Sequence, residues 1–92
     1  MSANDDLVEA AETGDIEKVK KAIKEGANVN VHSQSIWAPI IHAASNGHLE
    51  VVKYLIEHGA DMNIENPYTE TALCLAEGED VKNYLRKLGA KP

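Results

Sequence analysis

The chain repeats itself with a period of 33 residues, and this repetition limits what it can fold into more than any other feature. Identical residues recur 33 positions apart along the first two thirds of the sequence: Ala11 and Ala44, Gly14 and Gly47, Val19 and Val52, Gly26 and Gly59, Ala27 and Ala60, and Asn30 and Asn63. A unit of this length cannot bury its own apolar side and must stack on its neighbours. The period therefore predicts a row of similar stacked units.

The first copy, residues 1–30, has the pattern of two short helices. The apolar positions of the first helix are Leu7, Ala10 and Ala11, and we expect one of Asn4, Asp5 or Asp6 to be its N-cap. After a break at Gly14 and a new start at Asp15, the second helix carries its apolar stripe at Ile16, Val19, Ala22 and Ile23. Gly26 is suited to end this helix, because glycine accepts positive φ.

The central copy is the most regular of the three. Pro39 suits the first turn of a helix, and the apolar side of that helix is Ile40, Ile41, Ala43 and Ala44. A second helix follows with a stripe of Leu49, Val52, Leu55 and Ile56 and ends at Gly59. Before Pro39, residues 28–38 lose the helical period and are rich in short polar and β-branched residues. We expect an extended, hairpin-like loop there, which we call the first finger.

Residues 39–63 resemble one ankyrin repeat. The resemblance lies in Pro39, the pair Ala43 and Ala44, Gly47 and His48, the pairs Val51 and Val52, and Leu55 and Ile56, then Gly59, Ala60 and Asp61, and finally Asn63. It implies an all-α fold, an ankyrin-repeat solenoid of stacked helix-turn-helix pairs with short hairpin-like finger loops. The whole chain, residues 1–92, would then be a single domain with copies at about 1–30, 31–63 and 64–92.

The third copy departs from the pattern. Gly59 and Gly89 are 30 residues apart rather than 33. We expect Thr71 to cap a helix that runs through Leu73, Leu75 and Ala76, and a last stripe at Val81, Tyr84, Leu85 and Leu88. A shortened, polar copy is typical of the end of a solenoid, so we interpret it as a cap.

Composition argues against several classes of protein. The formal net charge of −6 opposes binding to the phosphates of nucleic acid. No apolar run approaches the roughly 20 residues that span a bilayer, and the acidic start does not resemble a signal peptide. A single cysteine, Cys74, agrees with a reducing compartment. We therefore expect an intracellular protein, cytoplasmic with the nucleus as an alternative, that is monomeric and binds neither membranes nor nucleic acid.

The residues that carry chemistry form no recognisable catalytic or metal pattern. The four histidines are His32, His42, His48 and His58, and their spacing matches no compact zinc motif. Cys74 lies between Leu73 and Leu75, which predicts a buried, inert thiol rather than a nucleophile. No glycine-rich phosphate loop is present. We expect no metal, no cofactor and no enzymatic activity.

The resemblance implies a protein-binding surface on the concave side of the solenoid, formed by the fingers and the exposed side of each first helix. Its positions in the first finger are His32, Gln34, Ser35 and Trp37, and those in the second finger (residues 65–70) are Glu65, Pro67, Tyr68 and Glu70. The first-helix positions are Glu12, Thr13, Ser45 and Asn46. Aromatic residues dominate the energetics of protein interfaces, so Trp37 and Tyr68 are the anchors we expect.

Trp37 and the asparagines Asn30 and Asn63 each have two interpretations, and Ala38 departs from the family pattern. Trp37 has two interpretations, as a partner contact or as a ring that packs down onto a neighbouring finger, for example against Tyr68. Ala38 stands where the family usually has a capping Thr, so we expect an uncapped helix start. Asparagines at the Asn30 and Asn63 positions are known hydroxylation targets in the family, but we favour a role in stabilising the hairpin loops.

The function that the resemblance implies is a protein–protein interaction module that binds its partner through the concave finger and first-helix face. The negative charge favours a partner with a basic patch. Two alternatives are a regulatory or inhibitory subunit of an enzyme, and a structural or engineered scaffold without a natural ligand.

Overall fold

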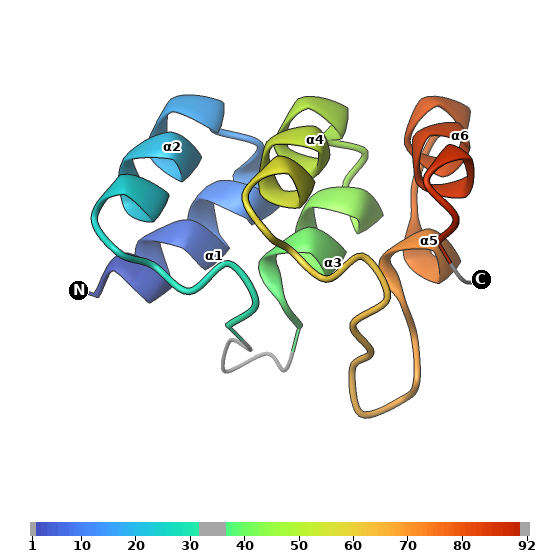
Figure 1. Cartoon of the computed structure of the whole chain (residues 1–92), viewed down its shortest axis with the longest axis horizontal. Helices are drawn as coiled ribbons and strands as arrows, with labels where there is room; N and C mark the ends of the chain where they lie inside the picture. Colours follow the sequence, from blue (N-terminus) through green and yellow to red (C-terminus); the bar gives the residue numbers. More distant parts are fainter. Residues whose placement is uncertain (1, 32–36, 91–92) are drawn as a thin grey trace.

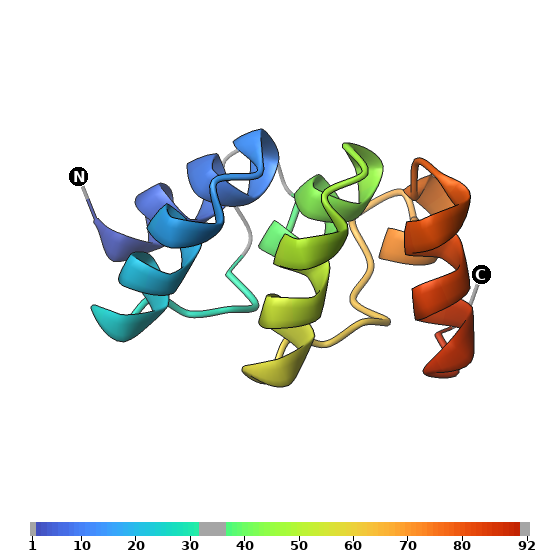
Figure 2. The same ribbon diagram turned by 90° about the horizontal axis from the view of Figure 1, so that it is seen from above.

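The computed structural model describes residues 2–31 and 37–90 of the chain. Over these residues the protein is helical, with helices α1 (Ala3–Thr13), α2 (Ile16–Lys24), α3 (Pro39–Ser45), α4 (Leu49–Glu57), α5 (Ala72–Leu75) and α6 (Glu79–Lys87). Consecutive helices form three pairs that stand side by side in one row, with α2, α4 and α6 along one side and α1, α3 and α5 along the other (Figures 1 and 2). Each predicted copy contains one pair, and the predicted solenoid is confirmed.

The loop between α4 and α5 carries the second finger and projects beyond the row of first helices (Figure 1). The described ends of the loop between α2 and α3 leave the row in the same direction. The sequence-predicted binding residues His32, Gln34 and Ser35 lie outside the described residues.

Side-chain caps set where three of the six described helices, α1, α2 and α5, begin. Asp15 and Thr71 cap α2 and α5, as the sequence predicted, through a side-chain oxygen that accepts from the backbone N–H three residues later. The cap of α1 was predicted wrongly, because Ser2 Oγ accepts from the Asp5 N–H at 3.1 Å. α1 therefore starts one residue before Asn4. Ala38 supplies no side-chain cap to α3, which confirms the expected uncapped start.

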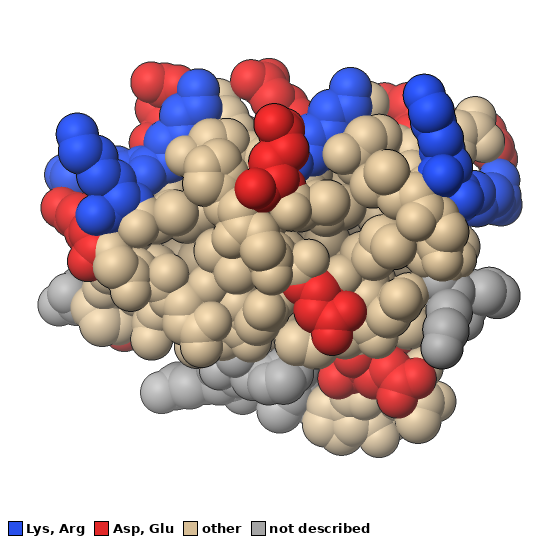
Figure 3. Space-filling view, viewed as in Figure 1, with Lys and Arg blue, Asp and Glu red and all other residues tan. Residues whose placement is uncertain are grey.

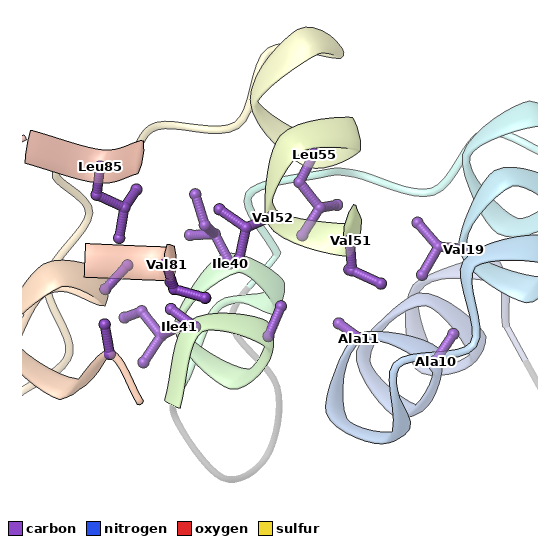
Figure 4. Packing of buried hydrophobic residues seen from close by; sticks show 14 of the residues in the cluster. Ala10, Ala11, Val19, Ile40, Ile41, Val51, Val52, Leu55, Val81 and Leu85 are labelled. Carbon is purple, nitrogen blue, oxygen red and sulfur yellow. The ribbon is translucent and has the colours of Figure 1, made fainter. Parts of the chain in front are cut away.

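The core is a continuous layer of aliphatic side chains that runs through all three pairs (Figure 4). Alanines line the first helices, and larger residues come mainly from the second helices: Ala10, Ala11, Ala43 and Ala44 against Val19, Val51, Val52, Leu55, Val81 and Leu85, all of them buried. Small side chains allow neighbouring helices to approach closely, because the distance between helix axes is set by the side chains at the contact. Of the stripe predicted for the central copy, Val52 and Leu55 are fully buried, while Leu49 and Ile56 pack partly buried against the core.

The first two pairs are also joined through the end of α1. His48 Nε2 lies 3.0 Å from the carbonyl oxygen of Glu12, and Asn46 Nδ2 donates to the same oxygen at 3.1 Å. The imidazole of His48 sits so close to Gly14 that a Cβ at that position would lie 2.7 Å from the ring, and Gly14 also has φ of +80°. Only glycine fits there. His48 therefore has the structural role that its place in the repeat implied.

The third pair differs from the prediction in three places. α5 ends at Leu75, so Ala76 lies outside the helix, because its backbone is already extended (φ −58°, ψ 137°). Leu88 is 41% exposed at the C-cap of α6 and does not complete the buried stripe. Cys74 is exposed rather than buried. In a helix of about 3.6 residues per turn, Cys74 lies about 200° round the axis from the buried Ala72, on the opposite side.

The side chain of Asn30 ties the first pair to the second. Asn30 Nδ2 donates to the carbonyl of Gly59 at 3.3 Å, and Asn30 Oδ1 accepts from the N–H of Asp61 at 2.8 Å. A similar bond occurs earlier in the chain, where Asn4 Oδ1 accepts from the N–H of Asn28 at 2.7 Å. These bonds confirm the loop-stabilising role expected for Asn30.

We predict that Asn30→Ala lowers the free energy of unfolding by about 1–2 kcal/mol, because two hydrogen bonds worth about 1 kcal/mol each are lost. Urea denaturation measures this change. The matched control is Asn83→Ala, since Asn83 is exposed on α6 and, among the described residues, its side chain bonds only Arg86, at 3.4 Å. That variant should stay within about 0.5 kcal/mol of the parent. Equal stabilities for the two variants would contradict the proposed tie between repeats.

Candidate protein-binding surface

The first-helix residues of the predicted surface lie at the ends of α1 and α3. Thr13 and Ser45 turn their hydroxyls back onto their own helices, where they donate to the carbonyls of Glu9 (3.1 Å) and His42 (3.2 Å). Asn46 bonds the Glu12 carbonyl across the two repeats. Among these positions, the Glu12 carboxylate and the outer part of Asn46 therefore offer the most freely presented polar groups, since both residues are exposed.

The second finger is a compact turn organised by Asn66. This side chain is only 4% exposed, and its Oδ1 accepts from the N–H groups of Tyr68 (2.9 Å) and Glu70 (3.0 Å). Its Nδ2 donates to Glu70 Oε1 at 2.8 Å. The backbone N–H of Asn66 also donates to the Glu70 carbonyl at 3.1 Å, while its carbonyl accepts from the N–H of Thr69 at 2.9 Å. Asn66 thus closes the loop on itself through five hydrogen bonds.

Thr69 completes the turn in an unusual conformation. Its φ is +60°, which makes it the one non-glycine residue with positive φ in the described part of the chain. A β-branched residue is rarely found in this region, because the backbone crowds its side chain, and such strain persists only where the surroundings hold it. The hydroxyl of Thr69 donates to the carbonyl of Tyr68 at 2.6 Å. The hydrogen bonds between residues 66 and 70 therefore hold the backbone of the finger tip in this conformation.

This turn places Tyr68 at the tip of the finger, where its side chain is 71% exposed. Glu65 and Pro67 beside it are also exposed, while Glu70 is partly buried and engaged with Asn66. Among the described residues, neither Glu65 nor Tyr68 forms a hydrogen bond with the first-helix positions. Tyr68 and Glu65 both belong to the second finger, whereas Glu12 and Asn46 lie at the ends of α1 and α3.

Trp37 lies at the base of the first finger, partly buried against the core. The ring beside it is that of His42, with centroids 5.3 Å apart and planes tilted by 52°. The buried part of Trp37 agrees with the interpretation that its ring packs onto the protein. The aromatic ring that it contacts is that of His42, and Tyr68, the example given for this contact, is largely exposed. A role of Trp37 in contacting a partner stays a prediction.

His42 links Trp37 to the first-helix positions. Its side chain is buried on α3, with the whole residue 5% exposed, and Nδ1 lies 3.7 Å from Glu12 Oε2 on the neighbouring repeat. Burial lowers the pKa of His42 below its ordinary 6.5, because the charged ring loses its water, and the nearby Glu12 carboxylate offsets this only in part. His42 is therefore a neutral imidazole at pH 7 and does not neutralise the negative charge of Glu12.

Sequence reasoning missed two residues that shape this surface, Asn66 and His42. For Asn66 the available signal was the dipeptide Asn66-Pro67, a combination that commonly starts a turn. The contact of His42 with Glu12 joins residues 30 positions apart in different repeats. No local pattern reports such a pairing.

Comparison with known families agrees with this architecture. The family model for ankyrin repeats, in three copies, matches residues 7–92, and the chain belongs to the ankyrin-repeat family. Ankyrin repeats are generally protein–protein interaction modules and are typically non-enzymatic. A comparison with curated proteins returned no match.

Two searches of the described residues concern other kinds of site. No group of three or more His, Cys, Asp or Glu side chains is placed to hold a metal ion within residues 2–31 and 37–90. Across the same residues, every helix is too short or too polar to cross a bilayer.

We predict that Asn66→Ala loosens the second finger, because the N–H groups of Tyr68 and Glu70 lose their acceptor. Amide hydrogen exchange at these two residues should accelerate at least about tenfold, which corresponds to the loss of about 1.4 kcal/mol of local stability. The control is Glu65→Gln, an exposed change in the same finger that should leave both rates near those of the parent. Unchanged exchange in Asn66→Ala would show that other contacts order the tip.

We predict that an NMR titration of the His42 ring gives a pKa below 6.5. Since the unfolded chain then binds this proton more readily than the folded one, the stability due to neutral His42 is complete above about pH 6.5. It is lost as the pH falls from 6.5 toward the folded pKa. His42→Gln should accordingly lose less stability than the parent between about pH 7.5 and 5 in urea denaturation. A His42 pKa at or above 6.5 would contradict the effect of burial.

Proposed function

We propose that this protein is an interaction module that holds a partner protein against its fingers and first helices. The observation that carries the proposal is the second finger, where a large aromatic side chain stands 71% exposed on a loop closed by internal hydrogen bonds. Tyr is among the residues that most often supply binding energy in protein interfaces. A large exposed apolar side chain held in one place is therefore best explained as an anchor.

The order of this finger favours affinity. A loop that is already held in its bound shape loses little conformational freedom when a partner binds, so more of the contact energy appears as affinity. Glu65 and Pro67 supply polar and small groups in the same finger as the anchor, as the rim of an interface does, and the outer part of Asn46 belongs to the first-helix part of the surface. Glu12 extends the same surface along α1, and Trp37 contributes the part of its ring that the core leaves uncovered.

The proposal keeps the remaining expectations of the sequence. The module would act as a monomer in the cytoplasm, and a net charge of −6 supports a protein rather than a nucleic acid as its partner. Recognition would use the residues named above, with Thr13 and Ser45 serving mainly to finish their own helices.

We predict that Tyr68→Ala reduces capture of the partner from a lysate of the source cells by at least about tenfold, because interface anchors are commonly worth 2 kcal/mol or more. The full-length chain is immobilised, and the captured proteins are quantified by mass spectrometry. The matched control is Leu88→Ala, which removes the other large apolar side chain that is exposed among the described residues, at the end of α6.

Leu88→Ala should capture as much of the partner as the parent chain does. Circular dichroism confirms that both variants retain the helical content of the parent. If the Tyr68→Ala chain captured the same proteins in the same amounts, the second finger would not be the binding surface.

A further inference from the structure

Basic side chains are confined to one side of this protein. Within the described residues, every Lys and Arg lies on a second helix: Lys18, Lys20, Lys21 and Lys24 on α2, Lys53 on α4, and Lys82, Arg86 and Lys87 on α6. The space-filling view shows these cations along the edge formed by the second helices, while the projecting finger carries acidic groups (Figure 3). The sequence itself has no Lys or Arg between Lys53 and Lys82, the stretch that contains the whole second finger.

The acidic side chains are not segregated in this way. The second helices hold five acidic residues beside their eight basic ones, which leaves an excess of three positive charges (8 − 5). This row contains the ion pairs Lys20–Glu17 (3.6 Å) and Arg86–Glu79 (3.7 Å). α1 carries four acidic residues and no basic one, and the second finger adds Glu65 and Glu70. The excess of negative charge therefore lies outside the second helices, on α1 and the loops, although Glu9 of α1 is paired with Lys18 at 2.7 Å. The second finger is among the parts of the chain that carry only negative charge.

Tyrosine rings on the second helices of this protein already lie under cations. Two of the three tyrosines, Tyr54 and Tyr84, lie under a lysine ammonium from the preceding repeat, with Lys20 Nζ at 5.8 Å and Lys53 Nζ at 5.4 Å from the ring centroids. Both distances are in the range of cation–π attraction. Tyr68 is the third tyrosine, and no cation from residues 2–31 or 37–90 covers its ring.

Tyr68 shares its short finger with two acidic residues, Glu65 and Glu70. Glu65 is exposed three residues before it and forms no ion pair within the described part of the chain. A cation placed over the ring would be attracted both by its π-face and by this carboxylate. A phosphate would be repelled by the same carboxylates, which opposes a nucleic acid as the occupant.

We propose that the second finger receives a basic side chain of the partner protein, with the cation over the ring of Tyr68 and in contact with the carboxylate of Glu65. Arginine suits the site better than lysine, because its planar guanidinium stacks on an aromatic ring and can pair with a carboxylate through two N–H groups. This inference rests on the proposed function, since it names the chemistry of the partner at the same surface.

The test uses a random twelve-residue peptide library displayed on phage and selected on the immobilised full-length chain. We expect the enriched peptides to share an arginine, and a synthetic peptide of the enriched sequence to lose at least about tenfold in affinity when that arginine is replaced by alanine. Its binding should also weaken as salt is raised, because exposed charges are screened.

Variants of the chain then locate the site. Tyr68→Ala should weaken the peptide about tenfold, while Tyr68→Phe should retain most of the affinity, because the phenylalanine ring keeps its π-face. Glu65→Gln should weaken it several-fold, and the matched control Glu57→Gln, an exposed glutamate on α4, should leave it unchanged.

The possible failures are distinguishable. Enriched peptides without a basic residue, whose binding still depends on Tyr68, would overturn this inference and leave the proposed function standing. Basic peptides that are unaffected by Tyr68→Ala, or affected equally by Glu57→Gln, would overturn it as non-specific attraction to an acidic protein. A selection that enriches no peptide would count against both proposals.

Discussion

The close stacking of the three helix pairs is the contact on which everything else in this protein depends. Each pair is too small to bury its apolar side, and α5 is only four residues long. The pairs gain a core only where the alanines of the first helices allow them to approach and the aliphatic side chains of the second helices close over the seam. The shortened last pair is also joined to the preceding repeat by a hydrogen bond, in which the N–H of Glu77 donates to the carbonyl of Ala44 at 2.9 Å.

This stacking also decides where polar groups can be used for recognition. The second helices carry every Lys and Arg of the described residues, and the second finger projects beyond the row of first helices (Figure 1). The second finger is held closed by the buried side chain of Asn66. Its amide oxygen accepts hydrogen bonds from two backbone N–H groups of the turn, and its amide nitrogen donates to Glu70. Because the turn is closed by its own hydrogen bonds, Tyr68 can stay exposed at its tip, in a finger that also carries Glu65 and Glu70.

Much of the fold could be predicted from the sequence, because the 33-residue period and the apolar stripes are local patterns. Caps at Asp15 and Thr71 were predictable for the same reason. Two residues of the last pair were predicted wrongly. Leu88 was placed in a stripe that ends before it, and Cys74 was placed on the buried side of α5 although it lies opposite the buried Ala72. Contacts between distant positions, such as His42 with Glu12, need the stacked structure to be seen.

The hydrogen bonds of the second finger have one further consequence. The bonds that shape the tip close between Asn66 and Glu70, while the bond that ties this loop to the previous repeat is made earlier, at Asp61. Residues 67 and 68 lie inside the closed turn and outside the stack, so their identity can drift with little effect on folding. Single substitutions at the finger tip can therefore change what the protein presents to its surroundings without first requiring extra stability to tolerate them.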